Sequence, residues 1–176
     1  MSNQGHIRRV NTKIAAGFEM IEEKLKRAGN LVELFETLVE EVESQFQVPF
    51  VWLTLVNNEK SAPVIEALQS SELLKERVSL ISPVFFREIF PSDLKPVLSN
   101  SNLKKYFRLF PADRKYFVRS IALVPFKISE EIWGIWNNGD ASPDRYLPDM
   151  ETTFLQRFAQ SFSESLAQLF QSGKIK

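Results

Sequence analysis

The chain of 176 residues contains no cysteine, a single histidine (His6) and only six glycines. Without cysteine there is no thiol nucleophile and no disulfide exchange. The usual zinc sites need clustered cysteine or histidine side chains, and a Ser-His-Asp triad would depend on His6 near the N-terminus. The few glycines include no phosphate-binding motif, and there is no serine elbow. These absences argue against an enzyme of the common hydrolytic, redox or zinc-dependent kinds.

An excess of one charge is also absent, because 22 Lys and Arg are balanced by 22 Asp and Glu. A net charge of zero argues against nucleic acid or a membrane surface as a partner bound through bulk charge. No apolar run approaches the roughly 20 residues that span a bilayer. The polar N-terminal residues 1–9 lack the apolar core of a signal peptide. We therefore expect a cytoplasmic protein.

The first 46 residues predict two amphipathic helices. Apolar residues between Ile7 and Ala28 recur at steps of three, four and seven, which fits a helix that packs on its own domain or one half of a dimer bundle. Asn30 and Glu33 then have the spacing of a capping box, which predicts a second helix from Leu31 to Phe46. We interpret the glutamates on its outer face as a solvated surface.

The middle of the chain predicts short elements. Residues 48–56 are rich in β-branched and aromatic side chains, which favours a strand. The further predictions are a strand at 64–68, a helix from Ser71 to about Ile81, a helix at 84–90, a strand at 95–99 and a helix at 102–109.

The C-terminal third has the clearest pattern. Apolar strands at 116–128 and 132–137 are separated by the polar turn Ser129-Glu130-Glu131, which predicts a hairpin. Gly134 inside the second strand indicates that another backbone or side chain approaches closely. A connector with the sequence Asn137-Asn-Gly-Asp-Ala-Ser-Pro-Asp-Arg-Tyr follows, and its Asp residues suit turn and capping roles. An amphipathic helix is then expected from about Pro148 to Phe170. The whole order predicts an α+β domain.

The hairpin containing Ile132-Trp-Gly-Ile-Trp, the Pro-Asp connector and the terminal helix together resemble the C-terminal half of a GAF domain, a small-molecule-sensing relative of PAS domains. The resemblance covers about residues 31–169 and is greatest with stand-alone bacterial GAF-like proteins of a family of unknown function. It implies a central antiparallel sheet of about five to six strands. The N- and C-terminal helices would lie on one face and shorter helices would roof the other. We expect a helical extension at residues 1–29 and a single GAF-like domain at residues 30–172.

The resemblance also implies a ligand pocket between the sheet and the roofing helices. The residues that we predict to bind a ligand there are Phe85, Phe86, Leu98, Tyr106, Phe110, Arg119, Ser120 and Ala122. Aromatic side chains in such a segment fit an apolar pocket and fit a filled core equally well. Some GAF domains attach a bilin through cysteine or bind haem through histidine. This chain lacks the cysteine and a suitable histidine, so we expect no metal and no cofactor other than an unknown small ligand.

Residues 104–127 carry seven cationic side chains and a single acid, Asp113. These cations are Lys104, Lys105, Arg108, Arg114, Lys115, Arg119 and Lys127, with aromatic residues between them. The segment fits a solvated surface, a site where an arginine such as Arg119 holds a small anion, or a patch for single-stranded nucleic acid. The zero net charge argues against the last of these.

We therefore hypothesise a non-enzymatic sensor that works as a homodimer. A ligand would change how the terminal helices pack, and a separate partner protein would detect that change. The predicted dimer interface consists of Ile7, Val10, Ile14, Ile21, Phe158, Phe162 and Leu169. On this hypothesis Ile14→Asp or Phe162→Asp separates the dimer without unfolding the sheet. The alternative is a structural protein-interaction module with a filled core and no ligand.

Overall fold

The chain begins with two helices, as its apolar stripes predict. In the computed structural model, which describes residues 3–176 except the side chains at 3 and 6–8, α1 spans Asn3–Leu25 and α2 spans Leu31–Phe46. The Asn30 Oδ1 accepts a hydrogen bond from the Glu33 backbone N–H, and the Glu33 carboxylate accepts one from the Gly29 N–H. The predicted cap of α2 is therefore confirmed, with its return bond one residue earlier than in a standard capping box.

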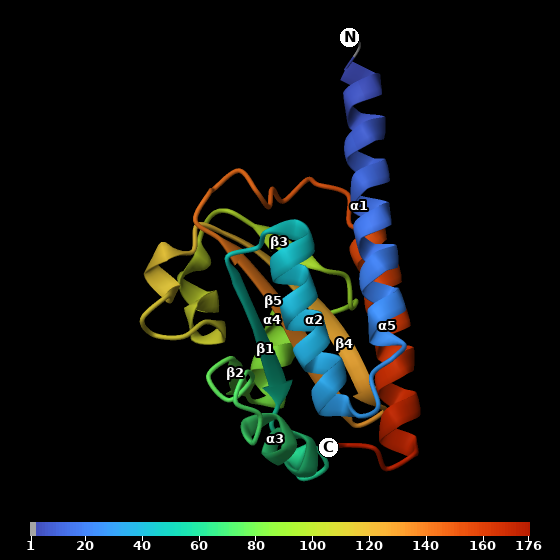
Figure 1. The fold of residues 1–176 in the computed structure, drawn as a ribbon. Helices are drawn as coiled ribbons and strands as arrows, with labels where there is room; N and C mark the ends of the chain where they lie inside the picture. Colours follow the sequence, from blue (N-terminus) through green and yellow to red (C-terminus); the bar gives the residue numbers. More distant parts are fainter. Residues whose placement is uncertain (1–2) are drawn as a thin grey trace.

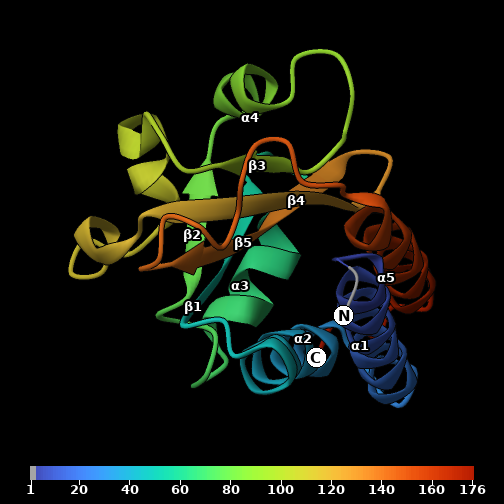
Figure 2. The same ribbon diagram turned by 90° about the horizontal axis from the view of Figure 1, so that it is seen from above.

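A five-stranded sheet forms the centre of the fold, in the order β2-β1-β5-β4-β3 (Figures 1 and 2). The strands are β1 (Phe50–Val56), β2 (Val78–Ile81), β3 (Val97–Ser99), β4 (Ser120–Ser129) and β5 (Ile132–Asp140). The α+β class and the strand number are confirmed. The sheet is not wholly antiparallel, because β1 and β2 run parallel while the other three pairs are antiparallel. The parallel pair arises because a helical crossover, not a hairpin, joins β1 to β2.

That crossover corrects two predictions. Residues 64–68 lie in the helix α3 (Ala62–Gln69) and not in a strand. A short apolar run cannot distinguish strand from helix, and Pro63 suits the first turn of a helix. The predicted helix from Ser71 to Ile81 is also wrong, because turns lead from Ser71 into β2. The Ser71 hydroxyl accepts a hydrogen bond from the Leu74 N–H, so it caps only a turn.

The remaining elements follow the predictions more closely. The helices expected at 84–90 and 102–109 appear as α4 (Pro83–Ile89) and the 3-10 helix η1 (Leu103–Leu109), and the short strand β3 is present. Strand β4 begins at Ser120, later than predicted, because the preceding residues form the 3-10 helix η2 (Lys115–Phe117). The last helix, α5 (Thr153–Gln171), begins after a turn at residues 147–150.

Helices lie on both faces of the sheet, so each face has its own core (Figure 2). Helices α1, α2, α3 and α5 cover one face, and we call the cluster beneath them the helix-face core. It includes Phe35, Phe126, Phe158 and Phe162, whose rings contact one another at centroid distances of 5.4–6.2 Å. On the other face α4 and η1 cover the roofed-face core, which includes Phe86, Phe90, Tyr106 and Phe110. The expected division of helices between the two faces is confirmed.

The two ends of the chain are part of this arrangement. Phe18, Ile21 and Leu25 of α1 are buried in the helix-face core, so the predicted boundary at residue 29 separates two helices that share one core. Beyond α5, the carbonyls of Lys174 and Ile175 accept hydrogen bonds from the first N–H groups of α2. These bonds satisfy donors that a helix N-terminus leaves unpaired.

The residues predicted to form a dimer interface divide into three groups. Ile21, Phe158 and Phe162 are no more than 2% exposed and lie in the chain's own core. Ile14 and Leu169 are half-buried against that core, whereas Val10 is exposed. The beginning of α1 extends past the sheet (Figure 1). The side chain of Ile7 lies outside the described residues. Most of this apolar stripe therefore stabilises the protomer itself.

Candidate functional site

The residues predicted to bind a ligand lie on both faces of the sheet. Phe85, Phe86, Tyr106 and Phe110 are buried in the roofed-face core, where they pack against the sheet and one another. Arg119 is exposed just before β4. The other three residues, Leu98, Ser120 and Ala122, face the opposite way.

The alternation of side chains along a strand explains this separation. On β4, Ile121 and Leu123 belong to the roofed-face core, whereas Val124 and Phe126 belong to the helix-face core. The Ala122 side chain lies on the same face of β4 as that of Val124, and Ala122 pairs with Leu98 on β3. The predicted residues therefore do not form one site. Sequence alone does not tell which of two alternating sets faces which layer.

A cavity of about 330 Å³ lies instead on the helix face, where the beginning of α5 meets α1 and α2. It is partly open to solvent, and the end of β5 and the connector at residues 141–152 contribute to its walls. Its walls are mainly apolar. The lining residues are Asn11, Ile14, Phe18, Val42, Phe46, Val48, Leu98, Trp136, Asn138, Arg145, Tyr146, Met150, Glu151, Phe154 and Leu155. Leu98 is the only member of the predicted ligand set among them.

Two residues of the cavity wall carry buried polar atoms that are not hydrogen-bonded. Trp136 and Asn138 are each 2% exposed, and neither the Trp136 Nε1 nor the Asn138 Oδ1 has a partner within the described part of the chain. Both residues are on β5, two positions apart, so they share the helix face. A buried donor or acceptor without a partner costs about 1–3 kcal/mol. Two residues that line the cavity therefore each contain one buried polar atom without a hydrogen bond.

Asn137, between these two residues, points to the other face and is held there. Its Nδ2 donates hydrogen bonds to the Thr54 Oγ1 at 2.8 Å and to the Leu109 carbonyl at 3.1 Å. Its Oδ1 is also without a partner among the described residues, but Asn137 does not line the cavity. Two consecutive asparagines in a strand buried on both faces are the sequence signal that our sequence analysis missed.

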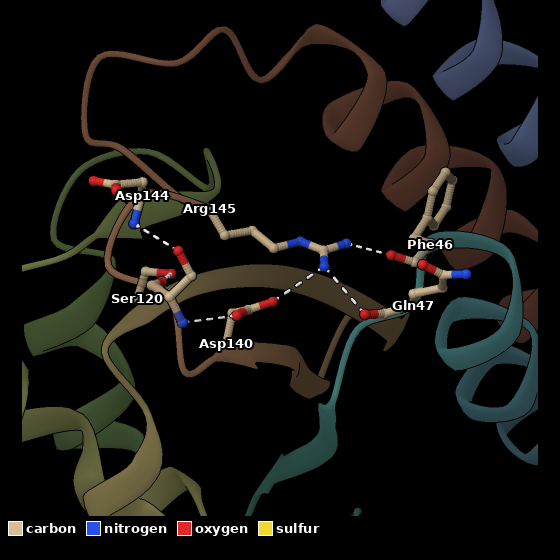
Figure 3. Close-up of polar contacts among 7 residues, drawn as sticks. Phe46, Gln47, Ser120, Asp140, Asp144 and Arg145 are labelled. Atoms are coloured by element: carbon tan, nitrogen blue, oxygen red, sulfur yellow. Dashed lines mark hydrogen bonds and ion pairs between the residues drawn. The ribbon is translucent and has the colours of Figure 1, made fainter.

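One wall of the cavity is held in place by Arg145 of the connector (Figure 3). Its Nη1 donates to the Gln47 carbonyl and forms an ion pair with the Asp140 Oδ2, both at 3.1 Å, and its Nη2 donates to the Phe46 carbonyl. Phe46 and Gln47 end α2, where unpaired carbonyls and the helix dipole favour a cation. Sequence analysis expected Asp140 in a turn role, and this is confirmed because its Oδ1 accepts from the Ser142 N–H.

The base of the connector is joined to the sheet by serine side chains. The Ser120 Oγ donates to the Ser142 carbonyl at 2.6 Å, and the Ser142 Oγ accepts from the Asp144 N–H at 3.3 Å (Figure 3). Ser120 therefore has a structural partner in place of the ligand that we predicted for it. The connector is fixed both to β4 and, through Arg145, to the end of α2.

Tyr146 lies next to Arg145 in the same wall. Burial raises the pKa of the Tyr146 hydroxyl to about 12, against an opposing effect of the Arg145 charge. The hydroxyl is therefore neutral over the ordinary pH range. The nearby Arg145 guanidinium lies 5.6 Å from the centre of the Tyr146 ring. The polar groups of this wall thus carry no excess charge, because the guanidinium is paired with Asp140.

The basic segment forms a separate surface on η1 and η2. Tyr116 and Phe117 are 73% and 62% exposed there, and Lys104 and Arg119 are exposed as well. The Arg108 guanidinium covers the Phe85 ring at 4.0 Å. None of these residues lines the cavity. The three interpretations of the basic segment stay predictions for this surface.

The side chains that the structure describes, at residues 4–5 and 9–176, also bear on metal and membrane sites. No group of three or more His, Cys, Asp or Glu side chains there is placed to hold a metal ion. None of the helices in this part combines the length and the apolar character needed to cross a membrane. No protein-family model matches the chain, and no curated protein matches it. The likeness to GAF domains therefore rests on the order of elements and on the residues quoted for it.

Proposed function

We propose that this protein is a non-enzymatic, GAF-like sensor that binds a small molecule in the helix-face cavity. The observation that supports this proposal is a mainly apolar cavity of about 330 Å³ whose lining also includes a few polar residues, among them Asn138, Arg145 and Tyr146. Ligand sites in proteins typically combine apolar walls with a few polar groups of this kind. The proposed site lies on the face of the sheet opposite the one that the resemblance implies.

The lining residues suggest how binding is transmitted. Ile14 and Phe18 belong to α1, while Phe154 and Leu155 belong to the first turn of α5. A ligand that favours one packing of α1 over another shifts the population of that packing, and without such a preference nothing is transmitted. The exposed N-terminal part of α1 then presents the change to a second copy of the chain or to a partner protein (Figure 1). We place this process in the cytoplasm.

A thermal-shift screen with two cavity variants tests the proposal. Ile14→Trp adds bulk to the cavity wall, and Val84→Trp places the same indole ring at an exposed site on α4 as a control. We expect one class of metabolite to raise the melting temperature of the wild-type protein saturably. At 100 times its Kd a ligand contributes about 2.7 kcal/mol of stability. The rise should disappear in Ile14→Trp and persist in Val84→Trp.

A second candidate function is a structural interaction module without a ligand. The exposed Tyr116 and Phe117 beside several cations favour it, because adjacent exposed aromatic rings are typical of contact surfaces. This candidate predicts no rise in melting temperature with any metabolite. A rise that persists unchanged in Ile14→Trp would also contradict the cavity as the binding site.

A further inference from the structure

We infer that the surface on η1 and η2 docks an acidic segment of a partner protein, and that this segment carries an aromatic or large aliphatic side chain. We call it the basic-aromatic surface, and its residues are Lys104, Phe107, Lys115, Tyr116, Phe117 and Arg119. The two helices, yellow to gold in Figures 1 and 2, project from the fold on the side opposite α1 and α5. None of the six residues lines the helix-face cavity, so the inference does not depend on the proposed ligand.

Contacts between the two 3-10 helices bring part of this surface together. The Phe107 ring of η1 meets the Tyr116 ring of η2 edge-on, with 5.8 Å between the ring centres. The Lys115 ammonium lies 5.0 Å from the centre of the Tyr116 ring. Side chains three residues apart share a face of a 3-10 helix, so Lys104 lies on the same face of η1 as Phe107. Two cations therefore accompany a pair of aromatic rings.

The residues after η2 extend the surface towards β4. Phe117 and Arg119 are exposed, whereas Val118 between them is 3% exposed and belongs to the roofed-face core. The backbone of Val118 is extended, and side chains two apart on an extended backbone point the same way. Phe117 and Arg119 therefore point to solvent on one side, and an aromatic residue again shares a side with a cation.

The cations of this surface have no carboxylate partner in the described part of the chain. Lys104, Lys115 and Arg119 take part in none of the ion pairs formed there, whereas cations on other elements are paired with acids. Asp113 is the single acid of residues 104–127, and it lies 3.6 Å from Arg114. A protein of zero net charge therefore has a local excess of positive charge here, which attracts an acidic partner.

The exposed rings specify the apolar part of the partner. Tyr116 and Phe117 are adjacent and are 73% and 62% exposed. Tyrosine, phenylalanine and arginine are enriched in protein interfaces, where aromatic side chains supply most of the binding energy. The cations around them add attraction at long range and select the sign of the partner's charge. A segment with acidic residues on both sides of one large apolar side chain matches both features.

Two observations favour a protein segment over single-stranded nucleic acid. The net charge is zero, whereas domains that bind nucleic acid are usually strongly basic. Continuous stacking also needs ring faces that successive bases can cover. The Tyr116 ring instead has the Lys115 ammonium over it and the Phe107 ring against it.

Peptide probes test the chemistry of the partner on the full chain by fluorescence anisotropy. The first probe is a fluorescein-labelled peptide with Asp and Glu on both sides of a single Phe. The second replaces the acids by Asn and Gln, and the third replaces the Phe by Ser. We expect each replacement to weaken binding at least about fivefold, and added salt to weaken binding of the first probe. Equal binding of the first two probes overturns the inference.

A labelled oligothymidylate of similar length is the fourth probe. We expect it to bind more weakly than the acidic peptide. If it binds more tightly, with the steep salt dependence of phosphate contacts, the partner is a nucleic acid and the inference is wrong.

Surface variants locate the binding site. Arg119→Glu and Phe117→Ser should each weaken binding of the acidic peptide at least about fivefold, and Lys104→Glu repeats the charge test on η1. Lys60→Glu and Val84→Ser are the matched controls and should bind normally. All five residues are exposed, so the melting temperatures should stay close to that of the wild type. Unchanged binding in the first three variants, or an equal loss in the controls, overturns the inference.

This inference and the proposed function fail separately. Ile14→Trp should leave peptide binding unchanged, and loss of peptide binding in that variant would contradict a site on η1 and η2. If the peptide binds but no metabolite raises the melting temperature, the sensor function is wrong and the basic-aromatic surface stands. If a metabolite binds but the peptide does not, the docking surface is wrong and the sensor function stands.

Discussion

The two faces of the sheet are both rich in aromatic side chains, yet they differ in how the space beneath the helices is used. On the roofed face, Phe86 packs against Phe90 and Trp133 at ring distances of 5.2 and 6.1 Å. On the helix face the aromatic core is equally continuous around Phe162, but a cavity remains at one end of it. Aromatic content alone therefore does not indicate a pocket.

The cavity lies where segments from distant parts of the sequence meet. Its walls come from α1, α2, β3, β5, the connector and α5. The roof on the other face consists instead of α4 and η1, which are short elements between β2 and β4 in the sequence (Figure 2). Helix α1 extends past the sheet (Figure 1), and side chains of the connector and of α5 line the cavity that α1 borders.

Substitutions of core phenylalanines on the two faces should give the largest effects. Phe162 is 2% exposed and Phe86 is 3% exposed, so Phe162→Ala and Phe86→Ala should each cost about 3–5 kcal/mol in urea unfolding. A cost near zero for Phe86→Ala would mean that the roofed face is loosely packed. This result would contradict the contrast between a filled roofed face and a helix face with a cavity. The burial of Phe162 also replaces the expectation for Phe162→Asp: we now expect unfolding and not separation of a dimer.

Alanine substitutions at two glycines of β5 compare how closely each face of the sheet is packed against the backbone. A Cβ at Gly134 would lie 2.4 Å from the Phe126 ring and 2.7 Å from the Thr54 carbonyl oxygen, which confirms the predicted close approach. Gly134→Ala should therefore destabilise the protein by about 1–3 kcal/mol or more. At Gly139 the nearest atoms, on the roofed face, would be 3.0 Å away, so Gly139→Ala should cost less. Equal costs for the two variants would contradict this ranking.

The raised pKa of Tyr146, a residue of the cavity wall, predicts that the free energy of unfolding depends on pH. Its folded-state pKa of about 12 is above the ordinary value of 10.0, so its stabilising effect is complete below about pH 10 and declines as the pH rises toward 12. Over this interval wild type should lose up to about 2 kcal/mol relative to Tyr146→Phe. Unfolding curves at stepped alkaline pH provide the measurement. The exposed Tyr116→Phe variant is the control, and a matching effect there would assign the pH dependence to another group.

The exposed apolar residues of α1 should give the smallest effect on stability. Val10 and Met20 are 42% and 51% exposed, so Val10→Asp and Met20→Asp should change the free energy of unfolding by about 0.5 kcal/mol or less. If α1 forms the dimer, light scattering should show that Val10→Asp lowers the molar mass of the particle. An unchanged dimer in both variants would place the contact elsewhere.

Sequence reasoning succeeded where the signal is local. The Asn30 cap and the hairpin around residues 129–131 depend on residues a few positions apart, and the structure contains both. It was wrong about residues 64–68, where four apolar residues in a run of five are too few to distinguish a strand from a helix. It also did not foresee that Trp136 and Asn138 would line one cavity, because their neighbours there come from other parts of the chain.

By itself, the amino-acid sequence determined the α+β class, the Asn30 cap, the turn at residues 129–131 and the absence of cysteine chemistry. These properties depend on composition and on short-range periodicity. Only the tertiary structure decided that β2 pairs in parallel with β1, that Leu98 and Ala122 face the helices, and that the cavity is on that side. The physical reason is that pairing between distant strands sets the register, and a shift of one residue exchanges the two faces of a strand.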